Sequence, residues 1–157
     1  MRFGSFSEVE LLELAQQNHV TQLALTDINN TSACLNFVRK APEYNIRPVL
    51  GIDFRNGVRP CFVGIAQNNE GYHELNTFLS HHLHQELEIP PKAPKFENAF
   101  VIYPFEQVLL NELDVSEAHE FIGVSINDLR KLPFSGLMQF RKKLVVLQSV
   151  TFRNKQD

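Results

Sequence analysis

Two acidic residues follow short apolar runs in the first third of the chain, where carboxylates could bind a metal ion or transfer a proton. The run Leu23–Leu25 breaks at Thr26-Asp27, and the run Pro48–Ile52 breaks at Asp53. Strands that are joined by a helix run parallel, and residues at their carboxyl ends gather at one edge of the sheet. The sequence therefore predicts that Asp27 and Asp53 lie at one edge, as candidate metal ligands.

A group of histidines offers a second possible metal site. His81 and His84 are three residues apart in a predicted helix over residues 69–85, and His73 lies two to three turns earlier. Histidines at this spacing share a helix face and can chelate a metal ion. The H-E-x-x-H pattern is absent, and a polar helix end that faces solvent accounts for these residues equally well. We expect only adventitious Zn²⁺ or Ni²⁺ binding at His81 and His84.

The elements that must position these residues alternate along the chain. Ser7 and Glu10 form a capping-box pattern at the start of a first helix, and Asn56-Gly57 predicts a type I′ turn. The residues between 106 and 119 fit a helix and a loop equally well. The predicted strands cover residues 22–26, 49–54, 59–66, 99–103, 121–124 and 144–147, and the further predicted helices cover residues 31–40, 69–85, 126–131 and 136–143. This alternation predicts one α/β domain with a parallel-rich sheet.

Composition limits what a chain of this size can do. The 157 residues, of which 43% are hydrophobic, can bury one sizeable core but cannot contain a polymerase. The formal net charge is −3 and the longest basic run is Arg141–Lys143, so we do not expect the chain to hold DNA by itself. Cys34 and Cys61 have no C-x-x-C spacing and are expected to be buried free thiols in a reducing cytoplasm. No apolar segment is long enough to span a bilayer.

Three segments carry a family resemblance. Ala24–Asn29, with the sequence ALTDIN, is similar to an A-L-T-D-H-N motif, and Pro48–Asp53 is similar to P-x-x-G-x-E. Ala66–Asn76 is similar to an A-K-N-x-x-G-Y-x-N-L segment. Together they resemble the PHP (polymerase and histidinol phosphatase) domain of the bacterial DNA polymerase III alpha subunit. The resemblance implies an irregular, incomplete (β/α) barrel and a role in DNA replication.

The resemblance also implies which metal ligands to look for. Intact PHP relatives hold up to three Zn or Mn ions with an H-x-H pair, an early Asp, the His of T-D-H, the Glu of G-x-E and later His and Asp residues. Here Phe3 stands near the place of the early Asp, Ile28 replaces the His, and Asp53 replaces the Glu. A lone carboxylate is too few ligands for such a site, so we expect no catalytic residue and no metal cofactor. Asp53 and Asp27 remain the candidate ligands, and Asp27 is also expected to cap the following turn.

By the same resemblance, residues 1–157 are expected to form one partial PHP domain that lacks the first strand and the last elements of the barrel. We expect a non-catalytic structural or partner-docking module in the cytoplasm. Its expected partners are the rest of the polymerase alpha subunit and a proofreading exonuclease subunit, with DNA contacted only through the parent and no membrane contact. Open sheet edges also predict a homodimer.

Two other functions remain open. A metal-dependent phosphoesterase or a proofreading 3′–5′ exonuclease would use a metal-activated water, which requires a complete ligand set. A stand-alone interaction module would need no ligands at all. The ligand set around Asp53 and Ile28 is therefore the feature that separates these functions.

Overall fold

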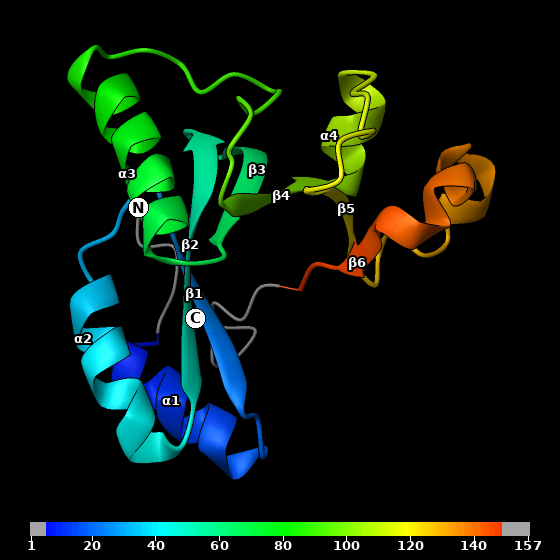
Figure 1. Ribbon diagram of the computed structural model, residues 1–157. Helices are drawn as coiled ribbons and strands as arrows, with labels where there is room; N and C mark the ends of the chain where they lie inside the picture. Colours follow the sequence, from blue (N-terminus) through cyan, green and yellow to red (C-terminus); the bar gives the residue numbers. More distant parts are fainter. Residues whose placement is uncertain (1–5, 149–157) are drawn as a thin grey trace.

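The computed structural model describes residues 6–148, which form one curled sheet with helices on its outer side (Figure 1). The sheet has six strands in the order of the sequence, β1-β2-β3-β4-β5-β6. The strands are β1 (Gln22–Ile28), β2 (Arg47–Asn56), β3 (Arg59–Ala66), β4 (Ala99–Pro104), β5 (Glu120–Val124) and β6 (Leu144–Val146). The curl gives half of a barrel, which confirms the incomplete (β/α) barrel expected from the sequence.

Strand directions place most strand ends at one edge. β1 pairs with β2 in parallel, and β4, β5 and β6 also pair in parallel. β3 is antiparallel to both β2 and β4. The carboxyl ends of β1, β2, β4, β5 and β6 therefore share one edge of the sheet, where β3 begins. Sites in parallel α/β folds are built at this edge.

The helices begin and end mostly where the sequence predicts. The α-helices are α1 (Glu8–Gln17), α2 (Cys34–Lys40), α3 (Asn69–His84) and α4 (Phe105–Leu110), and the 3₁₀ helices are η1 (Ala41–Tyr44), η2 (Leu132–Phe134) and η3 (Leu137–Lys143). The capping box at α1 is confirmed, because the Ser7 hydroxyl accepts from the Glu10 amide at 3.3 Å and the Glu10 carboxylate accepts from the Ser7 amide at 2.8 Å. The region of residues 106–119 contains most of α4, followed by a loop.

Two apolar clusters fix the helices on the outer face. The smaller cluster joins α1, α2 and β1 through Leu12, Leu25 and Phe37. In the larger cluster, the Phe54 ring lies 4.7 Å from Phe62 and 5.4 Å from Phe78, measured between ring centroids. Because side chains alternate along a strand, the helix-covered face takes Leu25 and Phe54, and the concave face takes their neighbours in sequence.

One turn prediction differs from the structure. The hairpin between β2 and β3 forms as expected, but a type I′ turn at Asn56-Gly57 is wrong. Such a turn needs positive φ at both central residues, and in this turn only Gly57 has it, at 60°. Asn56 stays in β2, where its side-chain amide bonds both the amide and the carbonyl of Ile89 at 2.8 Å.

The predicted helix over residues 126–131 is also wrong. The Asp128 carboxylate accepts from the Ser125 amide at 2.9 Å and from the Ser125 hydroxyl at 2.5 Å. These bonds close a local turn that competes with a helix. The helix predicted over residues 31–40 begins only at Cys34, because the Asn30 side chain accepts from the Ser32 amide and forms a turn first. The helix predicted over residues 136–143 is the 3₁₀ helix η3.

A buried polar network ties a proline-rich connector, residues 89–94 between α3 and β4, to the sheet. Glu120, at the start of β5, is only 2% exposed, and its Oε1 accepts from Lys92 Nζ and, at 3.0 Å, from the Tyr103 hydroxyl. The Tyr103 hydroxyl in turn accepts from the Ala93 amide at 3.2 Å. Glu120 Oε2 is buried and has no hydrogen-bond partner. The Glu120 carboxylate, whose charge Lys92 neutralises, therefore joins the bonds between Asn56 and Ile89 in holding the connector to the sheet.

No helix within residues 6–148 has both the length and the apolar character needed to cross a membrane.

Removing the lysine of this network is predicted to destabilise the fold. The Lys92→Met variant leaves the buried Glu120 carboxylate without a cation, and we expect the free energy of unfolding to fall by about 1–3 kcal/mol. Adding Glu120→Gln should restore most of that loss. The exposed pair of Lys95 and Glu97 gives the control, since Lys95→Met should change stability by less than about 0.5 kcal/mol. Urea unfolding followed by circular dichroism measures each value, and equal losses for both lysine variants would contradict the role of Lys92.

Candidate metal centre at the carboxyl edge of β1 and β2

Asp53 occupies a buried position near the carboxyl end of β2. It is 8% exposed, and its register partner on β1 is Ile28. Register partners in a parallel pair place their side chains on the same face of the sheet, so Ile28 is the neighbour of Asp53 on the concave face. An apolar β-branched side chain therefore stands beside the carboxylate where a metal ligand is expected by resemblance.

A cation from the same strand neutralises Asp53. The Arg55 guanidinium donates from Nη2 to Asp53 Oδ2 at 2.6 Å and from Nε to the same oxygen at 3.0 Å. Residues two apart on a strand share a face, which brings the two side chains together. Both side chains are mostly buried: counted for the side chain alone, the exposed fraction is 11% for Asp53 and 21% for Arg55. Charge-assisted bonds of this kind are stronger than neutral ones.

Asn29 holds Arg55 in place by extending the ladder between the two strands. Its backbone has a positive φ of 45°, and its amide donates to the Asp53 carbonyl at 3.1 Å. The Asn29 side chain then bonds the Arg55 backbone twice, with Nδ2 donating to the carbonyl at 2.7 Å and Oδ1 accepting from the amide at 2.9 Å. The side-chain amide thus replaces a backbone peptide at the end of β1. The register of β2 is irregular between Phe54 and Arg55, next to this contact.

Asp27 does not join Asp53. The register partner of Asp27 is Ile52, the residue before Asp53. Because successive side chains on a strand alternate between faces, Asp27 and Asp53 lie on opposite faces of the sheet. Burial raises the pKa of the Asp27 carboxyl above its ordinary value of 3.8, and the charge of Glu8 raises it further. The sequence correctly places both acids near one edge, but alternation of side chains separates them.

The capping role expected for Asp27 is taken by neighbouring residues. No hydrogen bond joins the Asp27 side chain to another residue of the described chain, whereas Asn29 bonds Arg55 and Asn30 bonds Ser32. Asp27 remains a half-buried carboxylate beside α1 and α2. Burial raises the pKa of the Cys34 thiol, the bond to Tyr72 opposes this rise, and the charge of Asp27 adds to it.

The donor set does not fit a metal cluster of the kind that the resemblance implies. Within residues 6–148, no three or more His, Cys, Asp or Glu side chains lie close enough together to hold a metal ion. On the concave face, Asp53 is flanked by Ile28 on β1 and by Val63, its register partner on β3. Phe3, which the resemblance sets near the early Asp, lies outside the described residues.

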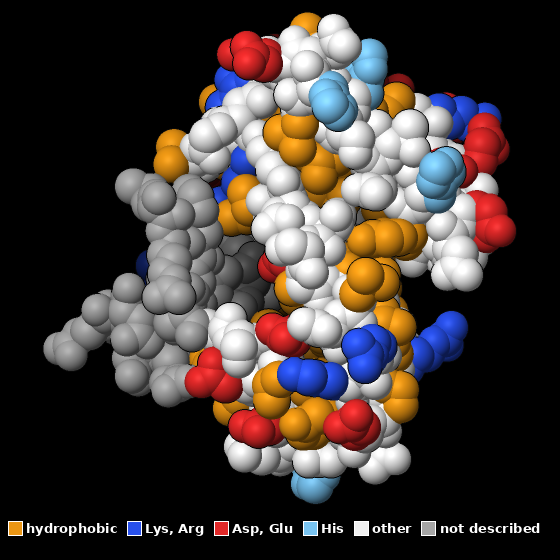
Figure 2. All heavy atoms as spheres, turned by 90° about the vertical axis from the view of Figure 1, so that its left-hand side faces the viewer, with side chains coloured by type: hydrophobic (Ala, Val, Ile, Leu, Met, Phe, Trp, Pro, Cys, Tyr) orange, Lys and Arg blue, Asp and Glu red, His pale blue; other side chains and the backbone are white. Residues whose placement is uncertain are grey.

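The histidines of α3 form no such group either. His81 and His84 are exposed near the carboxyl end of the helix. His82 lies between them in the sequence; its Nδ1 is 2.9 Å from the Phe78 carbonyl, and its ring is 4.1 Å from the Phe78 ring. Figure 2 shows histidine side chains on a mixed surface that also carries hydrophobic, acidic and basic groups.

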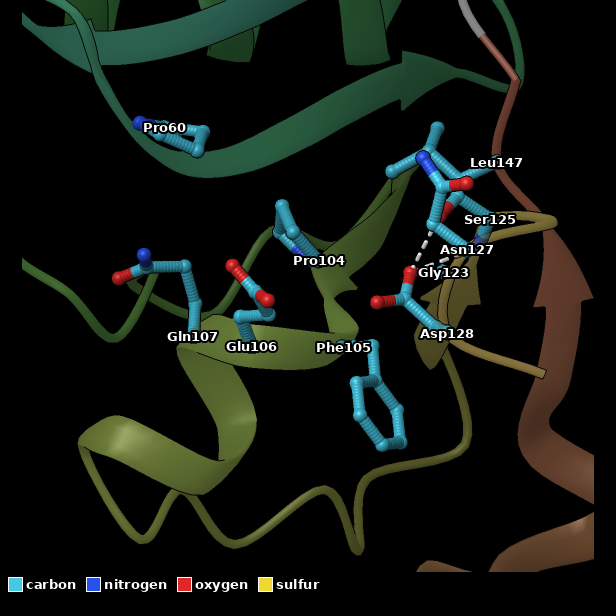
Figure 3. Close-up of a pocket in the computed structure, with 10 residues that line it drawn as sticks. All are labelled: Pro60, Pro104, Phe105, Glu106, Gln107, Gly123, Ser125, Asn127, Asp128 and Leu147. Carbon is cyan, nitrogen blue, oxygen red and sulfur yellow. Dashed lines mark hydrogen bonds between the residues drawn. The ribbon is translucent and has the colours of Figure 1, made fainter. Parts of the chain in front are cut away.

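Sequence reasoning missed two features of the carboxyl edge. The first is Arg55, whose only signal is a position two residues after Asp53 on a predicted strand. The second is a pocket of about 330 Å³ beyond β4 and β5, into which Glu106 and Asp128 extend (Figure 3). Each of these acids follows a strand in the sequence, and that was the pattern used to select Asp27 and Asp53.

Comparisons with known proteins agree with the resemblance carried by the sequence motifs. The family profile described as PHP domain matches residues 4–119. DNA polymerase III subunit alpha of Ureaplasma parvum serovar 3 is 24% identical over 149 residues, which cover 94% of this chain and 13% of the relative. Error-prone DNA polymerase of Symbiobacterium thermophilum is 34% identical over 85 residues, which cover 54% of this chain and 8% of the relative. The chain thus spans a small part of the length of these curated relatives.

The raised pKa of Asp27 predicts a pH-dependent loss of stability. A carboxyl whose pKa is higher in the folded state costs no stability below pH 3.8 and destabilises the fold as pH rises through the folded pKa. We therefore expect Asp27→Asn to be more stable than the parent at pH 7, with the difference vanishing below about pH 4. Thermal unfolding from pH 3 to pH 8 measures this, with Glu13→Gln on the exposed side of α1 as control. A constant difference across that range would contradict the assignment.

Proposed function

The chain belongs to the PHP domain family, and from this premise we propose that it is a metal-free PHP domain that serves as a structural module of a replicative DNA polymerase subunit. The relatives that it resembles are a DNA polymerase III alpha subunit and an error-prone DNA polymerase. The remainder of such a polymerase, rather than this domain, would carry out DNA synthesis.

The observation that carries the proposal is the ion pair between Asp53 and Arg55. Asp53 is the one residue that keeps a ligand-type side chain at a position matched to the family motif, and its Oδ2 accepts from Arg55 at 2.6 Å. A divalent ion at Asp53 would have to displace a buried guanidinium or share one carboxylate with it at close range. Ile28, the neighbour of Asp53, has no lone pair with which to compensate.

Hydrolytic chemistry has little support at this site. A metal-dependent phosphoesterase or exonuclease lowers the pKa of a metal-bound water, and that requires several converging ligands. Asp53 is paired with Arg55, and Asp27 is on the other face of the sheet. The structural role is therefore favoured over the phosphoesterase role.

We propose that the outer parts of the sheet meet the partners of this module. β6, at one edge, has only three residues, and the neighbouring segment exposes large apolar side chains, among them Phe134 at 89%. Exposed apolar surface of this kind commonly marks a protein interface. The rest of the polymerase subunit is the proposed partner, with a proofreading exonuclease as a further one. The homodimer expected from the open edges stays a prediction that light scattering at micromolar concentration decides.

Metal binding separates the two functions directly. We expect tag-free protein purified without chelator to contain far less than one metal ion per chain by mass spectrometry. Isothermal titration calorimetry with Mn²⁺ and Zn²⁺ should give no binding heat that depends on Asp53, because Arg55 already neutralises this carboxylate. The matched variant Ile28→His/Arg55→Ser restores one ligand and removes the competing cation, and it should bind metal more tightly than the parent.

The opposite result would overturn the proposal. Stoichiometric metal in the parent chain that is lost in Asp53→Ala would indicate a working metal centre and favour a phosphoesterase. Metal that is lost only in His81→Ala/His84→Ala would instead be adventitious binding on α3 and would leave the Asp53 site metal-free.

A further inference from the structure

The pocket at the carboxyl ends of β4 and β5 is separate from the Asp53 site in its residues and in its charge. It has a volume of about 330 Å³, and its walls include the rings of Pro60 and Pro104. Figure 3 shows the carboxyl groups of Glu106 and Asp128 turned toward the same space beside Pro104. The two acids come from successive connections after adjacent parallel strands, which is where α/β folds place ligand sites.

Each acid has an oxygen available to a ligand. Asp128 uses Oδ2 for its two bonds from Ser125, at 2.9 Å and 2.5 Å, and this fixes the orientation of its carboxylate. Asp128 Oδ1 and Glu106 Oε2 form no hydrogen bond with the described residues. The pocket therefore offers two carboxylate oxygens from different directions beside apolar proline surfaces.

The chain already supplies a cation to one of the two acids that line this pocket. Lys131 Nζ donates to Glu106 Oε1 at 2.8 Å, and both side chains are about three-fifths exposed. The bond and the charge of Glu106 raise the pKa of Lys131, and the charge of Asp128 adds to the effect. Exposed ion pairs of this kind contribute little to stability, so another cation can replace Lys131 at small cost.

We propose that this pocket binds the guanidinium group of an arginine side chain from a partner protein, and that Lys131 is the internal competitor which such a group displaces. A planar guanidinium donates in several fixed directions at once, which suits carboxylate oxygens that approach from two sides. Its alkyl stem would pack on the rings of Pro60 and Pro104. A divalent metal ion suits the pocket less well, because two carboxylates are fewer oxygen ligands than such ions normally take.

The test is an NMR titration of the full ¹⁵N-labelled chain with two probes. The peptide acetyl-Gly-Arg-Gly-amide represents a partner side chain, and free agmatine represents a small guanidine. We expect the peptide to shift the backbone amide signals of residues 105–107 and 123–128, and to bind more tightly than agmatine. Mg²⁺ at the same concentration should leave these signals nearly unchanged.

Variants assign the interaction to named groups. Lys131→Ala removes the competitor and should tighten peptide binding about two- to fivefold, whereas Glu106→Gln should weaken it by a similar factor. Asp128→Asn keeps an acceptor for Ser125 and should also weaken binding. Lys142→Ala removes a charge away from this pair and is the control for net charge. Because Glu106 and Lys131 are exposed, these variants should keep the parent spectrum elsewhere.

Four results would overturn the proposal. The first is the absence of shifts in residues 105–107 and 123–128 at millimolar peptide. The second is an equal response to Mg²⁺, which would indicate an ordinary acidic surface. The third is unchanged affinity in Lys131→Ala, which would remove the assigned competitor. Agmatine that binds as tightly as the peptide would overturn the assignment to a partner protein. None of these results bears on metal binding at Asp53, so this proposal and the proposed function fail independently.

Discussion

A buried carboxylate must be neutralised, and at Asp53 the cation comes from the chain itself. Arg55 provides it from the same strand, and Asn29 provides the backbone support that holds Arg55 at the end of the β1–β2 ladder. This arrangement depends on the parallel register that sets Ile28 beside Asp53. The turn after β1, the irregularity in β2 and the charge of the concave face are therefore linked through one ion pair.

The same solution recurs at the other end of the sheet. Asp53 and Glu120 are the acidic residues that are buried within residues 6–148, and each is paired with a basic side chain. Glu120 pairs with Lys92, which lies in the proline-rich connector, and this ion pair attaches the connector to the sheet. Both buried acids are thus neutralised by basic side chains of the chain itself.

Much of the fold follows from local sequence patterns. Capping at Ser7, the alternating strands and the β2–β3 hairpin were predictable because each depends on neighbouring residues. The pairing of Asp53 with Arg55 needs only strand alternation, yet its significance depends on burial, which comes from packing between distant segments. The separation of Asp27 from Asp53 depends on the register between β1 and β2, and no local pattern encodes it. Asn56 bonds the distant Ile89 instead of forming the predicted turn. Asp128 accepts from Ser125 and closes a local turn in place of the predicted helix.

The most direct test of the account is the coupling between Asp53 and Arg55. A double-mutant cycle of Asp53→Asn and Arg55→Gln, measured by urea unfolding in chelator, isolates their interaction. The account predicts that Arg55→Gln alone is more destabilising than the double variant, with a coupling free energy of about 1–2 kcal/mol. Mn²⁺ should not change the unfolding of the parent chain. A coupling near zero, together with stabilisation of the parent by Mn²⁺, would contradict the proposal that Arg55, and not a metal ion, neutralises Asp53.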